Sequence, residues 1–118
     1  MPSYTSLTVL AFGATSFITG VYALLSPGSV QSRLSLPPSS FPATRGNGLA
    51  AVAMGIYYTL AAAQENRAFF AATVPMRLVS AMVFWAQGGG WTAAGAWEGI
   101  GAALTGGAML VERGMDER

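Results

Sequence analysis

The sequence contains no cysteine, no histidine and no lysine. These absences exclude disulfides, thiol chemistry and metal sites built from cysteine and histidine, so we expect no metal. Charge is also scarce, because 9% of the 118 residues are charged, against about 25% in an average soluble domain. A net charge of +1 gives no basic footprint, and we expect no nucleic-acid partner. Without a phosphate-binding glycine loop or a haem-ligating histidine, we expect no cofactor.

What the chain does contain is apolar sequence. Hydrophobic residues make up 53% of it, and no charged residue occurs between Met1 and Ser32. A spanning helix needs about 20 mostly apolar residues, and four segments come close to that length. We therefore predict a single all-α domain over residues 1–118, an integral membrane four-helix bundle with antiparallel up-down-up-down topology and helices at about 5–26, 44–63, 67–87 and 90–112.

The connections fit this topology. Residues 26–44 carry four prolines and many serines, which predicts a loop rather than a helix. Residues 64–67 (QENR) and 87–90 (QGGG) are short turns, and short turns make neighbouring helices antiparallel. The first segment lacks the positively charged start of a cleaved signal peptide, so we expect it to be a spanning helix.

Two charges fall inside the predicted spans, Arg77 and Glu98. With a rise of 1.5 Å per residue, they lie ~15 Å and ~10 Å from the side of the bundle that carries the 87–90 turn. A charge at the bilayer centre costs at least ~2.5 kcal/mol, so each needs a partner or a wet cavity. We predict that both line one polar pocket in that half of the bundle.

Polar residues recur along helical faces that we expect to turn inward. One such stripe includes Thr73 and Arg77, another Thr15, Thr19 and Tyr22. From these stripes and their depths, we expect the catalytic residues to be Glu98, Arg77, Asn47 and Tyr22, and the substrate-binding residues to be Arg45, Tyr57, Tyr58, Thr19, Trp97 and Gln87.

Each of these features also has a purely structural interpretation. Arg77 and Glu98 could form a buried ion pair that fixes helix register, although such pairs stabilise little. Pro75 is either a tolerated membrane-helix proline or the cause of a bend that opens space around Arg77. The spacings Ala51-x-x-x-Gly55 and Gly95-x-x-x-Gly99 predict close helix packing, within one chain or between copies in a homo-oligomer.

The stretch ATRGNGLAAVAMGIYY (residues 43–58) follows a proline-containing loop and a first hydrophobic span, and a later span has a central arginine. This pattern resembles a group of small four-helix integral membrane proteins of filamentous fungi, a domain-of-unknown-function family distantly similar to the DoxX-like family. The resemblance covers nearly the whole chain. In that family an arginine followed by Asp or Asn opens the second helix, whereas here Gly46 separates Arg45 from Asn47. The resemblance implies a membrane-embedded tailoring step in the biosynthesis of fungal polyketides or terpenoids.

These features lead to competing functional hypotheses. The first is a cofactor-independent membrane enzyme doing acid–base chemistry (isomerisation, cyclisation or epoxide hydrolysis) on a lipophilic small molecule, with Glu98 as general acid or base and Arg77 stabilising negative charge. The alternative is a non-catalytic membrane scaffold or small-molecule-binding protein, and a channel or transporter subunit is the third. Membrane lipid is an expected partner. We expect an integral membrane protein of the endoplasmic reticulum, with both termini cytoplasmic by the distribution of arginines.

Overall fold

The computed structural model describes residues 2–118 and is all-helical, with no strand in that range. It confirms the all-α class. Two helices, Tyr4–Leu25 and Arg67–Gln87, are long and apolar enough to cross a membrane. The elements in chain order are α1 (Tyr4–Leu25), α2 (Pro27–Arg33), the short 3₁₀ helix η1 (Pro38–Ser40), α3 (Phe41–Ala63), α4 (Arg67–Gln87) and α5 (Trp91–Asp116).

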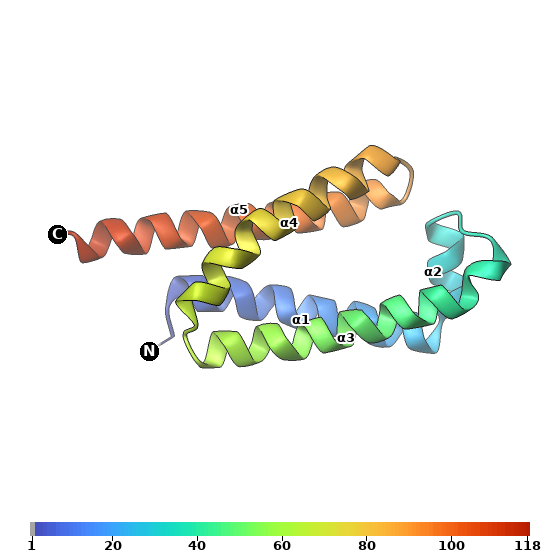
Figure 1. The fold of residues 1–118 in the computed structure, drawn as a ribbon, viewed down its shortest axis with the longest axis horizontal. Helices are drawn as coiled ribbons and strands as arrows, with labels where there is room; N and C mark the ends of the chain where they lie inside the picture. Colours follow the sequence, from blue (N-terminus) through green and yellow to red (C-terminus); the bar gives the residue numbers. More distant parts are fainter. Residues whose placement is uncertain (1) are drawn as a thin grey trace.

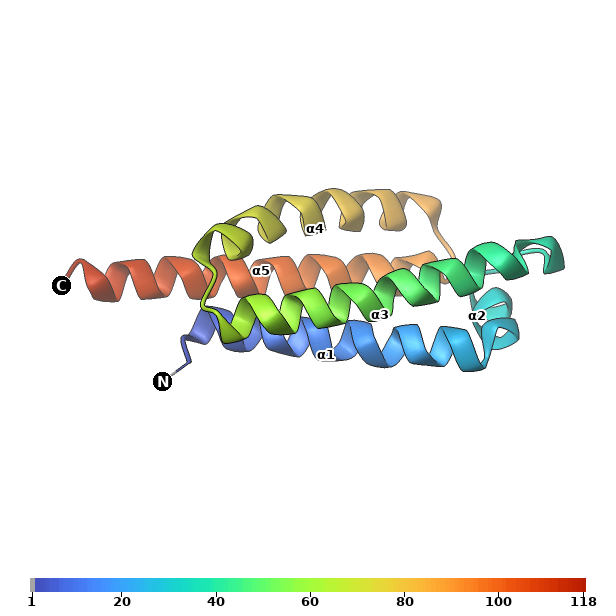
Figure 2. The same ribbon diagram turned by 60° about the horizontal axis from the view of Figure 1, so that its bottom comes forward.

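The four long helices form two antiparallel pairs (Figure 1). α1 packs along α3, and α4 packs along α5. The pairs are joined mainly through α1 and α5, so that α1 packs on both α3 and α5. Figure 2 shows α4 curving over α5. The N-terminus, the α3–α4 turn and the last turns of α5 lie toward one end of the 55 Å long molecule, and α2 lies at the other.

The expectation that residues 26–44 form a loop is wrong in part, because α2 and η1 lie within it and α3 begins at Phe41. The physical reason is the position of the prolines. Proline occurs in the first turn of α2, η1 and α3, where its missing N–H costs no hydrogen bond and its fixed φ suits the helix. Prolines read as helix stops therefore also start helices.

The α1–α3 pair is held together at glycines. Gly13 and Gly20 of α1 face Gly55 and Gly48 of α3, a spacing of seven residues on both helices. A Cβ added at Gly20 would lie 2.6 Å from the Gly48 carbonyl oxygen, and one at Gly55 would lie 2.7 Å from the Gly13 carbonyl oxygen. The two backbones approach too closely for any side chain, as small residues allow in helix pairs.

The two small-residue motifs expected from the sequence lie at interfaces inside this chain. Gly55 packs on Phe17 of α1, and Ser16 of α1 donates a hydrogen bond of 2.8 Å to the Ala51 carbonyl. Gly95 packs against the backbone of Ala81 and Trp85 of α4. These glycines are thus used within the chain, between neighbouring helices.

We predict that Gly55→Ala lowers the free energy of unfolding by about 1–3 kcal/mol, because the methyl group must push α1 and α3 apart. The matched control is Gly46→Ala on the same helix, where an added Cβ meets nothing within 4 Å and helix propensity improves. Thermal unfolding in detergent micelles, followed by circular dichroism, measures both. Equal stability of the two variants would contradict the close approach.

A cluster of polar side chains closes the end of the molecule that carries the N-terminus; we call it the clasp. The Ser3 backbone N–H and hydroxyl donate hydrogen bonds of 2.7 Å each to the Glu65 carboxylate. The Thr5 N–H and hydroxyl donate bonds of 3.0 and 2.6 Å to Glu112, which also accepts a bond of 2.8 Å from Arg67. Two carboxylates therefore sit at the start of α1, where a helix favours negative charge, and tie it to the α3–α4 turn and to α5.

The hydrogen bond from the Ser3 backbone N–H, and then that from its hydroxyl, lowers the pKa of Glu65 below its ordinary value of 4.5. A carboxyl whose pKa is lower in the folded state stabilises the fold at pH values above its unfolded pKa. That stabilisation is lost as the pH falls from about 4.5 through the lower native pKa.

We therefore predict that the unfolding temperature falls as the pH is lowered from about 7 to about 3, and that Glu65→Gln makes this fall smaller. The control is Glu117→Gln, which removes a carboxylate whose side chain is 67% exposed and accepts a hydrogen bond from Arg113, four residues earlier. The measurement is thermal unfolding across the pH series. A pH dependence unchanged by Glu65→Gln would show that the Ser3–Glu65 contact does not stabilise the fold.

Candidate functional site

Arg77 occupies the interior of the molecule, on the face of α4 that also buries Phe70 and Thr73. It is 2% exposed. The sequence places it there because Phe70, Thr73 and Arg77 recur at intervals of three and four, which puts them on one side of a helix. α1, α3 and α5 supply its other neighbours. The expected burial of this guanidinium is therefore observed.

Threonine hydroxyls partner one side of the guanidinium. Arg77 Nη2 donates to the Thr105 hydroxyl oxygen at 2.7 Å and to the Thr73 hydroxyl oxygen at 3.2 Å. The Thr8 hydroxyl of α1 donates to the Thr5 carbonyl at 2.7 Å and shares a bond of 2.9 Å with Thr105. Because the Thr8 proton is already used, Thr105 donates to Thr8. The hydroxyl chain is thus oriented so that Thr105 offers a lone pair to Arg77.

The guanidinium also lies over an aromatic ring. Arg77 Cζ is 4.5 Å from the centroid of the Phe12 ring and 5.8 Å from that of Tyr58, distances at which ring faces attract a cation. Gly101 of α5 makes room for this arrangement, since a Cβ there would lie 3.0 Å from Arg77 Nη1 and 2.8 Å from Phe12. A residue without a side chain is therefore required where the cation and the ring meet α5.

Glu98 stands one turn before Gly101 on α5 and is 6% exposed. The two ion pairs within 4.0 Å among residues 2–118 are Arg67–Glu112 and Arg113–Glu117, so Arg77 and Glu98 are not directly paired. Instead, Arg77 Nη1 and Glu98 Oε2 are both buried without a hydrogen-bond partner in that range. Buried polar atoms are normally satisfied, and here one strong donor and one strong acceptor remain open.

Aromatic side chains pack around these charges. The Trp97 ring stacks on Phe12 at 4.1 Å with an interplanar angle of 12°, and its Nε1–H donates a hydrogen bond of 3.0 Å to the Thr15 hydroxyl. The Tyr58 ring lies 5.2 Å from Phe12 on the α3 side. The structure thus brings together Arg77, Tyr58 and, through Phe12, Trp97, beside the turn of α5 that carries Glu98.

Other expected site residues lie elsewhere. Asn47 and Arg45 are exposed on the first turns of α3, where the Arg45 guanidinium lies 5.8 Å from the Phe41 ring. Tyr57 is exposed beside the buried Tyr58, and Gln87 is exposed at the end of α4. Asn47 is exposed because of its position around the helix. Thr44, Gly48 and Gly55 lie on the buried face of α3, and Asn47 does not share that face.

The expectation that the polar stripe of the first helix turns inward is wrong. Thr15, Thr19 and Tyr22 are exposed. The Thr15 and Thr19 hydroxyls donate to carbonyl oxygens of their own helix, three or four residues earlier, and this satisfies them without a buried partner. Tyr22 faces the Arg33 guanidinium of α2 at 5.7 Å.

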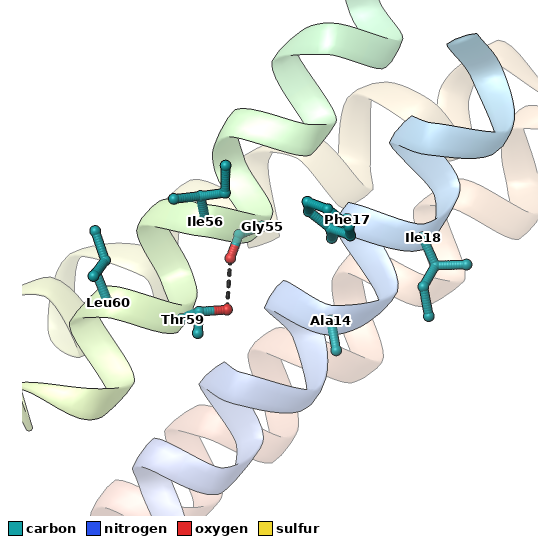
Figure 3. Close-up of a pocket in the computed structure, with 7 residues that line it drawn as sticks. All are labelled: Ala14, Phe17, Ile18, Gly55, Ile56, Thr59 and Leu60. Atoms are coloured by element: carbon teal, nitrogen blue, oxygen red, sulfur yellow. Dashed lines mark hydrogen bonds between the residues drawn. The ribbon is translucent and has the colours of Figure 1, made fainter. Parts of the chain in front are cut away.

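Three of the grooves on the surface of residues 2–118 are lined by neither Arg77 nor Glu98. Figure 3 shows one of about 510 Å³ between α1 and α3, where the Thr59 hydroxyl donates to the Gly55 carbonyl of its own helix and the remaining side chains are apolar. The others lie between α4 and α5, of about 580 Å³ near the clasp and about 500 Å³ around Trp85 and Gly95.

Sequence reasoning missed the closest neighbours of the buried charge. Phe12 and Gly101 carry no signal of their own, because one is an apolar residue in an apolar span and the other is one of 15 glycines. Thr8 meets Arg77 only through Thr105, and its spacing of seven residues from Thr15 links it to a stripe that the structure leaves exposed. Only the fold pairs these positions with Arg77.

Searches of protein-family models, of curated proteins and of solved structures find no match to this chain. Among the described residues, no group of three Asp or Glu side chains lies close enough to hold a metal ion.

We predict that Thr105→Val lowers the free energy of unfolding by about 1.5–3 kcal/mol, the value of a hydrogen bond to a charged group. The change leaves Arg77 Nη2 with Thr73 alone. Thr59→Val is the control, because its hydroxyl donates only to its own helix and the residue is exposed. Chemical or thermal unfolding in micelles compares the two. A Thr105→Val variant as stable as Thr59→Val would show that Arg77 does not need this acceptor.

Proposed function

We propose that this chain is an integral membrane protein in which α1, α3, α4 and α5 all span the bilayer. The distribution of residues supports this. Among the described residues, polar or charged side chains are buried as often as apolar ones, eight of each, whereas twenty-three large apolar side chains are exposed. Such a surface suits lipid, where polar groups must find partners inside the protein.

The charges follow the same logic. Arg67, Glu112 and Arg113 lie near the clasp end, and Arg33 and Arg45 lie near the end that carries α2. In the part of the molecule between these two ends, the described residues carry two charged side chains, Arg77 and Glu98, and both are buried. Ionisable groups at such a depth are functional candidates by default.

We further propose that Arg77 and Glu98 receive the polar group of a lipophilic small molecule and carry out cofactor-independent acid–base chemistry on it. The single observation that carries this proposal is that Arg77 Nη1 and Glu98 Oε2 are buried and unpartnered without being paired to each other. An epoxide, carbonyl or hydroxyl oxygen placed between them accepts a hydrogen bond from the guanidinium. The Glu98 carboxyl then gives a proton to that molecule or takes one from it.

The surrounding side chains suit this chemistry. Thr73, Thr105 and the Phe12 ring fix the guanidinium, so its remaining N–H needs no reorganisation when negative charge develops. Trp97 and Tyr58 supply apolar walls. Isomerisation and cyclisation need only these roles. Epoxide hydrolysis also needs a water molecule, which attacks an epoxide carbon and gives a proton to the Glu98 carboxylate as the C–O bond of the ring breaks, while Arg77 stabilises the ring oxygen until it takes up a proton. Lipophilic epoxides and polyenes are the substrates to test first.

The second candidate is a non-catalytic membrane scaffold or binding protein. It is favoured by the three hydrogen bonds that already hold Arg77 to Thr73 and Thr105, and by grooves that reach neither charge. In this role the same open atoms bind a polar molecule without changing it.

The parent protein is first screened for turnover of lipophilic epoxides and polyenes. We predict that Glu98→Gln lowers the turnover of any compound that the parent converts by about 10²-fold or more, the usual contribution of a general acid or base. Its unfolding temperature stays close to that of the parent protein, because glutamine has nearly the same shape. Glu117→Gln, which changes the exposed carboxylate directly after the same helix, is the control. Product is measured by chromatography and mass spectrometry.

Equal turnover in Glu98→Gln and the parent would contradict the acid–base role. Compounds that raise the unfolding temperature in a manner dependent on Arg77 and Glu98, yet are never converted, would establish the second candidate in place of the enzyme.

A further inference from the structure

The groove of about 580 Å³ between α4 and α5 near the clasp has an amphipathic lining; we call it the α4–α5 groove. Its floor is apolar and includes Val74, Pro75 and Leu110, with Gly106 opening it on the α5 side. Its rim is charged and consists of Arg67, Glu112, Arg113 and Asp116. Neither Arg77 nor Glu98 lines it, so it is separate from the site described above.

The local sequence explains why the two helices part here. Pro75 lies inside α4, and a proline within a helix removes one hydrogen bond and bends it. α4 follows a curved path in Figure 2. On the other wall, Gly106 carries no side chain, and a Cβ there would meet Val74 only at an ordinary contact distance of 3.6 Å.

The length of the groove matches one leaflet of a bilayer. From Gly106 to Asp116 α5 advances ten residues, which is ~15 Å, and the hydrocarbon core of a bilayer is ~30 Å thick. The charged rim lies at the end with the clasp, and the apolar floor runs from it toward the middle of the molecule. A single acyl chain beneath a headgroup has this arrangement.

The charges of the rim select the headgroup. Arg67 and Glu112 already neutralise each other at 2.8 Å. Arg113 and Asp116 remain, three residues apart on α5, a spacing that puts two side chains next to each other. Arg113 pairs with Glu117, but both side chains are largely exposed, at 78% and 67%, and such pairs are weak. One positive and one negative group side by side complement a phosphate joined to an ammonium.

We propose that the α4–α5 groove binds one zwitterionic phospholipid, with an acyl chain on the Val74, Pro75 and Leu110 floor, its phosphate at Arg113 and its ammonium at Asp116. An anionic headgroup is disfavoured because it lacks the ammonium and leaves the Asp116 carboxylate facing a negative charge. The lipid site is independent of the chemistry at Arg77 and Glu98. It needs only that the chain lies in a bilayer.

The test is native mass spectrometry of the full chain in detergent, titrated with palmitoyl-oleoyl phosphatidylcholine or with the corresponding phosphatidylglycerol. We expect a one-to-one adduct that forms at lower concentration with phosphatidylcholine. Gly106→Leu fills the groove and weakens this adduct about tenfold or more, since a leucine side chain displaces the acyl chain. Gly107→Leu, next to it but outside the lining and in open space, leaves the adduct unchanged.

The headgroup is tested separately. Arg113→Gln weakens phosphatidylcholine binding about two- to fivefold, the range for an exposed charge contact, whereas Arg118→Gln, which does not line the groove, has no effect. This surface pair decides the proposal even if Gly106→Leu fails to fold. A stronger adduct with phosphatidylglycerol, equal adducts with the two lipids, or equal behaviour of Arg113→Gln and Arg118→Gln would overturn it.

Discussion

The buried guanidinium of Arg77 is the interaction around which the helices are arranged. It sits at 2% exposure and contacts groups from every long helix: Thr73 on its own helix α4, Phe12 of α1, Tyr58 of α3 and Thr105 of α5. A buried charge that loses a partner is strongly destabilising. The positions of α1, α3 and α5 relative to α4 are therefore constrained together by one side chain.

Close backbone packing makes that arrangement possible. The four glycines between α1 and α3 bring those helices within van der Waals contact of each other's backbones, and Gly101 leaves α5 room for the cation and the Phe12 ring. Glycine weakens a helix in water, but in a bilayer it gives the close contact that apolar side chains cannot give. The same packing holds Glu98 inside, one turn from Gly101, and leaves Arg77 Nη1 and Glu98 Oε2 open.

The sequence was sufficient for the parts of this structure that depend on local pattern. The helical class follows from composition, and the burial of Thr73, Arg77 and Glu98 follows from the helical spacing of the first two and from the need of a charge within a span for a partner. The inner face of α1 could not be predicted from polarity. There Gly13, Ser16 and Gly20 lie inside while Thr15 and Thr19 bond to their own backbone.

The neighbours of the buried charge could not be predicted for a different reason. Whether Phe12 or Tyr22 faces Arg77 depends on how α1 crosses α5, and a single chain carries no record of that pairing in its local pattern. The α2 helix was missed because prolines start helices as readily as they end them. Both cases concern tertiary contacts or helix starts rather than hydrophobic periodicity.

The measurement that tests the central claim most directly is a crystal structure grown from a lipid mesophase, examined between Arg77 Nη1 and Glu98 Oε2. We predict that these atoms lie more than 4.0 Å apart. We also predict that electron density shows a water molecule or the polar group of a ligand within hydrogen-bond distance of both atoms. A direct ion pair between them, with no density in between, would contradict the claim and leave Arg77 and Glu98 as a structural pair.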